Sequence, residues 1–154
     1  MTIESDFLII GSGIAGLSFA LKVAEHGSVA LVTKKAVMDS NTNLAQGGIA
    51  SVFSPLDSFD LHIRDTLAAG DGLCNPDVVE IVVTQGPGRI RELIALGVSF
   101  NLKTTPDTAS EVETFDLGQE GGHSRKRIVH AQDMTGREVA RVLIEHVTEH
   151  PNIE

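Results

Sequence analysis

Three glycines near the N-terminus have the spacing that binding of a pyrophosphate requires. Gly11, Gly13 and Gly16 form the pattern G-x-G-x-x-G between a short apolar run and a helical pattern. The first glycine allows a tight turn, the second lets the backbone approach a phosphate, and the third lets the helix pack closely on a strand. The N–H groups and the partial positive charge at the start of that helix favour an anion. In this context the pattern predicts a dinucleotide site.

The residues expected at the adenosine ribose do not identify the dinucleotide. A carboxylate usually ends the second strand of such a unit, about 20 residues after the first glycine. This sequence has Thr33, Lys34 and Lys35 there. Thr33 could hydrogen-bond a ribose hydroxyl, and the two lysines are either ligands of a 2′-phosphate or surface charges. The glycine pattern therefore leaves NAD, NADP and FAD open.

Two longer motifs carry more information than the glycines. Residues 40–50 read "SNTNLAQGGIA", and residues 120–139 read "EGGHSRKRIVHAQDMTGREV". Together with "AGDGLCNP" at 69–76 and "LIALGVSF" at 93–100, they resemble, in the same order, segments of the succinate dehydrogenase and fumarate reductase flavoprotein superfamily. Within that superfamily, the motif at 120–139 resembles the L-aspartate oxidase family in particular.

The resemblance implies an α/β fold, namely a Rossmann-type FAD-binding domain that begins with a GR2-like β-α-β unit. Residues 1–154 would form the N-terminal part of that domain, incomplete at the C-terminus and without the family's capping and C-terminal helical domains. The implied activity is FAD-dependent oxidation of L-aspartate to iminoaspartate, the first step of de novo NAD biosynthesis. Oxygen or fumarate would accept the electrons, and quinolinate synthase would receive the product.

The same resemblance assigns the cofactor contacts to the glycine turn, to one lysine and to the polar loop. These residues are Gly11, Ser12, Gly13, Ile14, Ala15, Gly16, Lys34, Asn41, Thr42, Asn43, Leu44, Ala45, Gln46, Gly47 and Gly48. Respiratory members of the superfamily have a histidine at the position of Asn41, and it bonds covalently to the flavin. Asparagine has no comparable ring nitrogen, so we expect FAD to be held non-covalently.

The substrate residues that the resemblance implies are Glu120, His123 and Ser124. Glu120 would hold the ammonium group of aspartate, which succinate lacks, by an attraction that strengthens in a desolvated pocket. His123 and Ser124 would donate hydrogen bonds to a substrate carboxylate, and we expect Arg127 to position the loop. The family's catalytic arginine lies in a later segment, so no catalytic residue is assigned in this chain. No group of side chains has the spacing of a metal site.

Two other functions stay open at this point. One is the flavoprotein subunit of a fumarate reductase or succinate dehydrogenase, against which Glu120 and Asn41 argue. The other is a truncated FAD-binding module without catalysis. For an incomplete domain we expect no activity from the chain alone, and weak FAD binding or none.

Composition excludes several classes of protein. The 154 residues are 42% hydrophobic and 21% charged, which suits one soluble domain with a core. A net charge of −9 argues against nucleic-acid partners and anionic membranes. No apolar run approaches the roughly 18 residues of a membrane span, and the single cysteine, Cys74, suits a reducing compartment. We expect a cytoplasmic protein.

The elements that position these motifs follow from periodicity and from capping signals. The sequence predicts strands over 6–10 and 28–33, joined by a helix over 14–26 that ends at Gly27. A second helix is expected over 58–69.

The elements in the rest of the chain are predicted from residues that begin, interrupt or end helices. Asn75 and Pro76 should begin a helix, which "GPG" at 86–88 should break or kink before it ends at Gly97. We further expect a strand over 98–100, an exposed excursion or hairpin over 101–119, and a strand over 127–131. A last helix should run to about residue 150, with Thr135 and Glu138 as its capping box. A further strand should begin after it.

Overall fold

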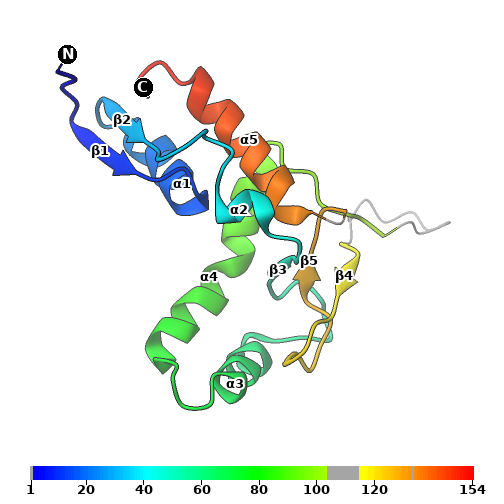
Figure 1. Cartoon of the computed structure of the whole chain (residues 1–154). Coiled ribbons are helices and arrows are strands. Elements are labelled where there is room, and N and C mark those ends of the chain that lie inside the picture. The colour runs from blue at the N-terminus through cyan, green and yellow to red at the C-terminus, as the bar shows by residue number, and fades with distance from the viewer. Residues whose placement is uncertain (1, 104–114, 133) are drawn as a thin grey trace. The chain divides into compact units, whose positions relative to one another are not determined.

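β1 (Phe7–Ile10), α1 (Ile14–Val23) and β2 (Val29–Val32) form the β-α-β unit expected from the sequence (Figure 1). β1 and β2 pair in parallel over all four residues. Ile153, after the last helix, pairs in parallel with Val29 on the other side of β2. The strand expected to begin near the end of the chain therefore joins the same sheet.

The computed structural model describes residues 2–103, 115–132 and 134–154. The chain divides into two units. Unit 1 consists of residues 1–46, 96–98 and 134–154, and unit 2 consists of residues 47–95 and 99–133.

In unit 1, α5 (Thr135–Glu149) packs against α1 and against α2 (Asn41–Leu44). Val139, Leu143 and Val147 of α5 recur at helical spacing and are buried. Figure 1 shows α2, in cyan, beside the first turns of α5, in orange. This stripe and the inner face of α1 form the core of the unit.

The side chains on the two faces of the sheet in unit 1 differ in their exposure to solvent. Leu17 and Ala20 of α1 are fully buried. Leu8 and Ile10 of β1 and Val32 of β2 are exposed, with 64%, 83% and 52% of their surface accessible. Apolar side chains thus line both faces of these parallel strands, and those on one face remain exposed.

In unit 2, β3 (Ile49–Ala50), β5 (Ile128–Val129) and β4 (Leu117–Gly118) form an antiparallel sheet in that order. α3 (Phe59–Ala69) and α4 (Pro76–Ala95) pack on each other. α3 and α4 each begin at a side-chain cap. Within the described residues, no helix is both long and apolar enough to cross a membrane.

The caps of α3 and α4 are local sequence features. Ser58 Oγ accepts a hydrogen bond from the N–H of Leu61 at 3.2 Å. Asn75 Oδ1 accepts from the N–H of Asp77 at 3.0 Å. These side chains satisfy N–H groups that the first turn of a helix leaves unpaired, so both predicted starts are confirmed.

The predicted end of α1 is wrong. The helix ends at Val23 with Ala24 as its C-cap, so Gly27 does not cap it. A Cβ on Gly27 would instead collide with the side chain of Asp6. Asp6 Oδ2 accepts hydrogen bonds from the N–H and the hydroxyl of Ser28, both at 2.8 Å. Glycine at position 27 leaves room for this link between the start of β1 and the start of β2.

The sequence predicted a break or a kink at 86–88. A break is excluded, because α4 runs through Pro87 without interruption. Proline removes one backbone hydrogen bond from a helix. Val83, Pro87 and Ile90 lie four and three residues apart and are all buried. Burial of this face maintains the helix despite the missing donor.

The stretch 98–100 is not a strand, although Val98 and Phe100 are buried. Leu102 and Phe115 form an antiparallel bridge, which agrees with the expected hairpin at its base. Residues 104–114, most of the stretch for which an exposed excursion or hairpin was expected, lie outside the described residues.

The capping box predicted for α5 is wrong. Thr135 is the first helical residue, and Met134 is the N-cap, which makes no side-chain capping hydrogen bond. The pattern T-x-x-E occurs one position too late to cap this helix. Glu138 pairs instead with Arg141 on the surface of α5.

Candidate functional site

The turn between β1 and α1 has the geometry that a phosphate-binding turn needs. Gly11 has φ +111°, a conformation that favours glycine. A Cβ on Gly16 would overlap the carbonyl oxygen of Gly11, so α1 approaches the turn closely. α1 has no acidic residue in its first turn, which leaves the partial positive charge of its N-terminus to an anion. Ser12 is buried, and its hydroxyl lies 3.1 Å from that of Thr33.

The polar loop after β2 folds back onto this turn within unit 1. Ser40 Oγ accepts from the N–H of Asn43 at 3.3 Å and thereby caps α2. Thr42 Oγ1 accepts from the N–H of Ile14 at 3.0 Å. The same hydroxyl would lie 3.6 Å from a Cβ on Gly13. The structure thus brings together two of the three segments to which cofactor contacts were assigned.

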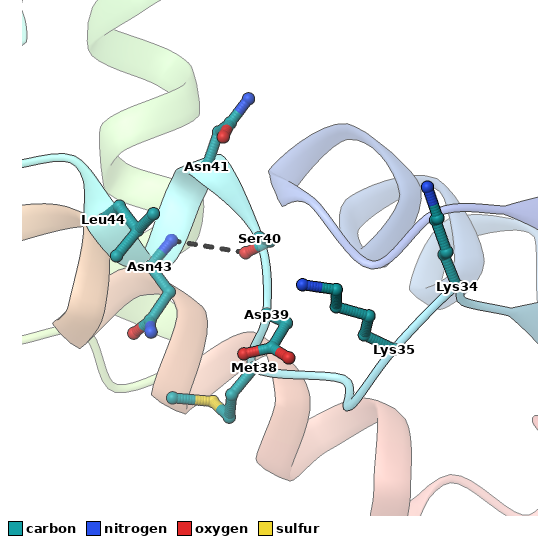
Figure 2. A pocket seen from close by; sticks show the side chains of 8 residues that line it. All are labelled: Lys34, Lys35, Met38, Asp39, Ser40, Asn41, Asn43 and Leu44. Atoms are coloured by element: carbon teal, nitrogen blue, oxygen red, sulfur yellow. Dashed lines mark hydrogen bonds between the residues drawn. The ribbon is translucent and has the colours of Figure 1, made fainter.

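A cleft of about 370 Å³ lies beside α2. The side chains that line it in Figure 2 are Lys34, Lys35, Met38, Asp39, Ser40, Asn41, Asn43 and Leu44. The ammonium group of Lys35 extends toward the segment of Asp39 (Figure 2). Asn43 Oδ1 is buried and has no hydrogen-bond partner among the described residues. An unpaired buried acceptor next to a lysine-lined cleft suits a polar ligand that brings its own donors.

α5 contacts the polar loop at a glycine. The N–H of Gly136 donates to the carbonyl oxygen of Ala45 at 3.0 Å. A Cβ on Gly136 would overlap the carbonyl oxygen of Thr42. Sequence reasoning missed this role, since it assigned residues 135–138 to a cap. The available signal was a glycine in the first turn of a strongly amphipathic helix.

The end of the polar loop and the predicted substrate loop meet within unit 2. A Cβ on Gly47 would lie 3.3 Å from Glu120 Oε1. A Cβ on Gly48 would overlap the carbonyl oxygen of Val129, so β3 and β5 pair closely only with glycine there. The predicted cofactor residues up to Gln46 belong to unit 1, whereas these two glycines and the predicted substrate residues belong to unit 2.

The predicted substrate loop is held by a buried guanidinium. Arg127 donates to both oxygens of Asp57, each at 2.8 Å, and to Asp65 Oδ2 at 2.7 Å. The same Asp65 oxygen accepts from the N–H and the hydroxyl of Ser124, at 2.7 and 2.8 Å. The expectation that Arg127 positions the loop is confirmed. The hydroxyl hydrogen of Ser124 is engaged in the loop and is not free for a substrate carboxylate.

The hydrogen bonds in this cluster lower the pKa of the carboxyl groups of Asp57 and Asp65. Hydrogen bonds from Ser124, with its backbone N–H first, lower the pKa of Asp65 to about 2. Burial raises the pKa of Asp57, but hydrogen bonds from Arg127 and from the N–H of Ser58 outweigh it, so the net shift is downward. Sequence reasoning missed both aspartates, because nothing near them in the chain indicates a distant partner.

His62, on α3, is the buried histidine of this cluster. Its side chain is 6% exposed, and its Nδ1 has no hydrogen-bond partner among the described residues. Burial lowers the pKa of His62, the charges of Arg127 and His123 lower it further, and Asp57 and Asp65 oppose this. The ring lies 5.7 Å from the ring of His123, between centroids.

We expect the stability of the chain to fall in two steps as the pH is lowered. The folded-state pKa of His62 is below 6.5, so below that pH the unfolded chain takes up a proton that the folded chain resists. Asp65 adds a second loss between pH 3.8 and about 2. Urea unfolding from pH 8 to 2 measures both steps. His62→Gln should remove the upper step and keep the lower one, and an unchanged upper step in this variant would contradict the assignment.

Residues 6–154 match the family model described as the FAD binding domain. The chain belongs to this FAD-binding family. The prediction of FAD, which the glycine pattern alone left open, is therefore confirmed. The close-packed turn, the anion-favouring start of α1 and the unpaired acceptor of Asn43 in a lysine-lined cleft all fit such a cofactor.

Members of the family with similar sequences include L-aspartate oxidases. L-aspartate oxidase 2-a of Nicotiana tabacum, named as chloroplastic, is 55% identical over 148 residues, which are 96% of this chain and 22% of that protein. L-aspartate oxidase of Yersinia pestis is 45% identical over 149 residues, which are 97% of this chain and 27% of that protein. The chain thus spans about a quarter of the length of the curated relatives it matches.

Solved structures place the fold in the expected superfamily. A quinol fumarate reductase of E. coli superimposes with a TM-score of 0.88 at 32% identity, over 100% of this chain and 26% of that chain. Sdh1 of Mycobacterium smegmatis superimposes with a TM-score of 0.83 at 28% identity, over 97% of this chain and 26% of that chain. The fold is that of the FAD-binding domain of these flavoproteins, with mixed helices and strands.

Proposed function

We propose that the protein oxidises L-aspartate to iminoaspartate with FAD as the redox cofactor. Its domain would be Rossmann-type, and residues 1–154 would supply the N-terminal part of it. The relatives with 40–55% identity that are named L-aspartate oxidases support this proposal. The 154-residue chain alone would be inactive, because the catalytic groups of the family would come from other segments.

The observation that carries the proposal is the proximity of Glu120 to Gly47. Position 47 lies near the end of the loop to which flavin contacts were assigned, and a Cβ there would lie 3.3 Å from the carboxylate of Glu120. An acid at this place can hold the ammonium group of an amino dicarboxylate near the flavin loop. Succinate and fumarate offer no cation to that acid, so the carboxylate favours aspartate.

When bound, FAD supplies an isoalloxazine ring that takes up the hydride from C2 of the substrate. The residues of this chain bind and orient. The glycine turn and the start of α1 would hold the pyrophosphate, Lys34 would lie by the adenosine ribose, and the loop 41–48 would hold the flavin. Asn41 lacks the nucleophilic ring nitrogen of a histidine, so the flavin would be held without a covalent bond.

A fumarate reductase or succinate dehydrogenase flavoprotein is the second candidate. The superposition on a quinol fumarate reductase over the whole chain favours it. Oxygen or fumarate as electron acceptor, transfer of the product to quinolinate synthase and a cytoplasmic location belong to the first proposal.

The deciding experiment is anaerobic reduction of the flavin in the protein expressed from its complete reading frame. We expect L-aspartate to bleach the flavin absorbance and succinate to leave it unchanged. Glu120→Gln should raise KM for aspartate at least about tenfold, since a hydrogen bond to a charged group contributes about 1.5–3 kcal/mol. Glu149→Gln, at the surface end of α5, is the matched control and should have no effect. Bleaching by succinate alone would instead establish the second candidate.

A further inference from the structure

His123 receives a hydrogen bond from the buried guanidinium. Its Nδ1 lies 3.1 Å from Nη1 of Arg127. Arginine offers five N–H donors and no acceptor, and it stays charged in proteins. The ring nitrogen that faces it must therefore accept, and in the neutral imidazole the accepting nitrogen carries no hydrogen. The hydrogen of His123 then lies on Nε2.

The guanidinium has no freedom to leave this position. Its side chain and that of Asp57 are fully buried, and the two form a bidentate ion pair. Nη1 carries two hydrogens and has two acceptors, Asp65 Oδ2 at 2.7 Å and His123 Nδ1 at 3.1 Å. Each donor of this nitrogen thus has its own acceptor.

The backbone of His123 is fixed on both sides as well. Its carbonyl oxygen accepts from the Gln119 side chain at 2.7 Å, and its N–H donates to the carbonyl oxygen of Glu120 at 3.3 Å. Ser124, the next residue, is tied to Asp65. The ring is half-buried, and no described residue forms a hydrogen bond with its Nε2. One donor on an oriented ring is left for a ligand.

We propose that Arg127 is a positioning residue that fixes the tautomer of His123, so that His123 presents its Nε2–H to a carboxylate of the substrate. The carboxylate role rests on the proposed function. Glu120, three residues earlier, would hold the ammonium group of the same molecule. An amino dicarboxylate carries the cation and the anion that these two side chains require.

The tautomer is measured directly by two-bond ¹⁵N–¹H correlation NMR of the 154-residue chain labelled with ¹⁵N-histidine. The signals of His123 are identified by their loss in His123→Gln. We expect a single Nε2–H form. An Nδ1–H form, or an average of the two, overturns the proposal. In Arg127→Lys the single ammonium group cannot keep all these contacts, and the signals should average. If that variant fails to fold, the wild-type spectrum still decides.

The carboxylate role is tested with succinate as the probe, in the FAD-bound protein from its complete reading frame. His123→Asn keeps an acceptor near the Nδ1 position but has no donor at Nε2. His123→Gln places an amide donor near Nε2. We expect His123→Asn to raise the succinate Kd about tenfold and His123→Gln to raise it less than about threefold. Equal effects in the two variants, or no succinate binding by the wild type, overturn this role.

The two proposals fail in different ways. A flavin that aspartate does not reduce removes the proposed function, while the NMR spectrum and the succinate titration still report on His123. Reduction by aspartate together with an averaged His123 spectrum keeps the function and overturns the role of Arg127.

Discussion

Replacing Arg127 with methionine is expected to lower the free energy of unfolding of the chain by about 3–5 kcal/mol. The side chains of Arg127 and Asp57 are fully buried, and that of Asp65 is 14% exposed. Methionine fills much of the same space but leaves both carboxylates without their cation, and an uncompensated buried charge is costly. Urea unfolding followed by far-UV circular dichroism measures the loss, since the chain has no Trp or Tyr for fluorescence.

Arg141→Met is the matched control. Arg141 also contacts two carboxylates, Glu138 at 3.0 Å and Glu145 at 3.1 Å, but its side chain is 53% exposed. Such surface pairs contribute about 1 kcal/mol or less. Adding Asp57→Asn to Arg127→Met should recover part of the stability, because it removes one of the uncompensated charges. Equal losses for the two arginine variants would contradict the assignment of the loss to buried charge.

Gly136→Ala is expected to destabilise the chain by about 1–3 kcal/mol, the usual cost of overpacking. The sign is opposite to that of the same change in an exposed helix, where alanine is favoured by about 0.5–1 kcal/mol. The added Cβ would overlap the carbonyl oxygen of Thr42 and crowd Ala45. α2 must then move away from α5, so FAD binding to the full-length protein should weaken together with stability.

Gly88→Ala provides the control for this substitution. Gly88 lies inside α4, and a Cβ there would meet no atom within 4 Å. We expect this variant to be slightly more stable than the wild type and unchanged in FAD binding. Urea unfolding and quenching of flavin fluorescence measure the two properties. A stabilised Gly136→Ala would show that α5 does not approach the polar loop this closely.

The parts of the fold that depend on neighbouring residues could be predicted from the sequence. The caps at Ser58 and Asn75 lie within three residues of the N–H groups they satisfy. The β-α-β unit follows from the apolar runs and from the glycines, whose spacing indicates a tight turn between a strand and a helix. The two long motifs assigned Gly47 to the flavin and Glu120 to the substrate, and in the structure a Cβ on Gly47 would lie 3.3 Å from Glu120 Oε1.

The predictions that failed depended on tertiary packing. Pro87 should break an isolated helix, but in α4 it is buried with its neighbours on one face. Gly27 follows α1 closely enough to suggest a cap, yet its place is set by Asp6, far away in sequence. Thr135 and Glu138 have the spacing of a capping box, and only the position of α5 shows that it begins one residue earlier.

The carboxylates that hold Arg127, and through it the predicted substrate loop, could not be predicted from the sequence. Arg127 lies 70 residues from Asp57 and 62 from Asp65. A lone aspartate gives no signal of a partner at that distance, and the basic run at 124–127 resembles a solvated loop. The role of Arg127 was expected from its motif, but the carboxylates that hold it became visible only in the folded chain.

The exposed residues of the parallel sheet in unit 1 determine how readily copies of the chain associate with one another. Among the described residues, β1 pairs only with β2, so one edge of β1 is unpaired, and Leu8 and Ile10 are exposed beside it. Such an edge is a template for strands of other molecules. The net charge of −9 keeps copies of the chain apart at low ionic strength. Salt shortens the range of that repulsion to about 3 Å at 1 M, so concentrated salt removes the protection and leaves apolar edges free to associate.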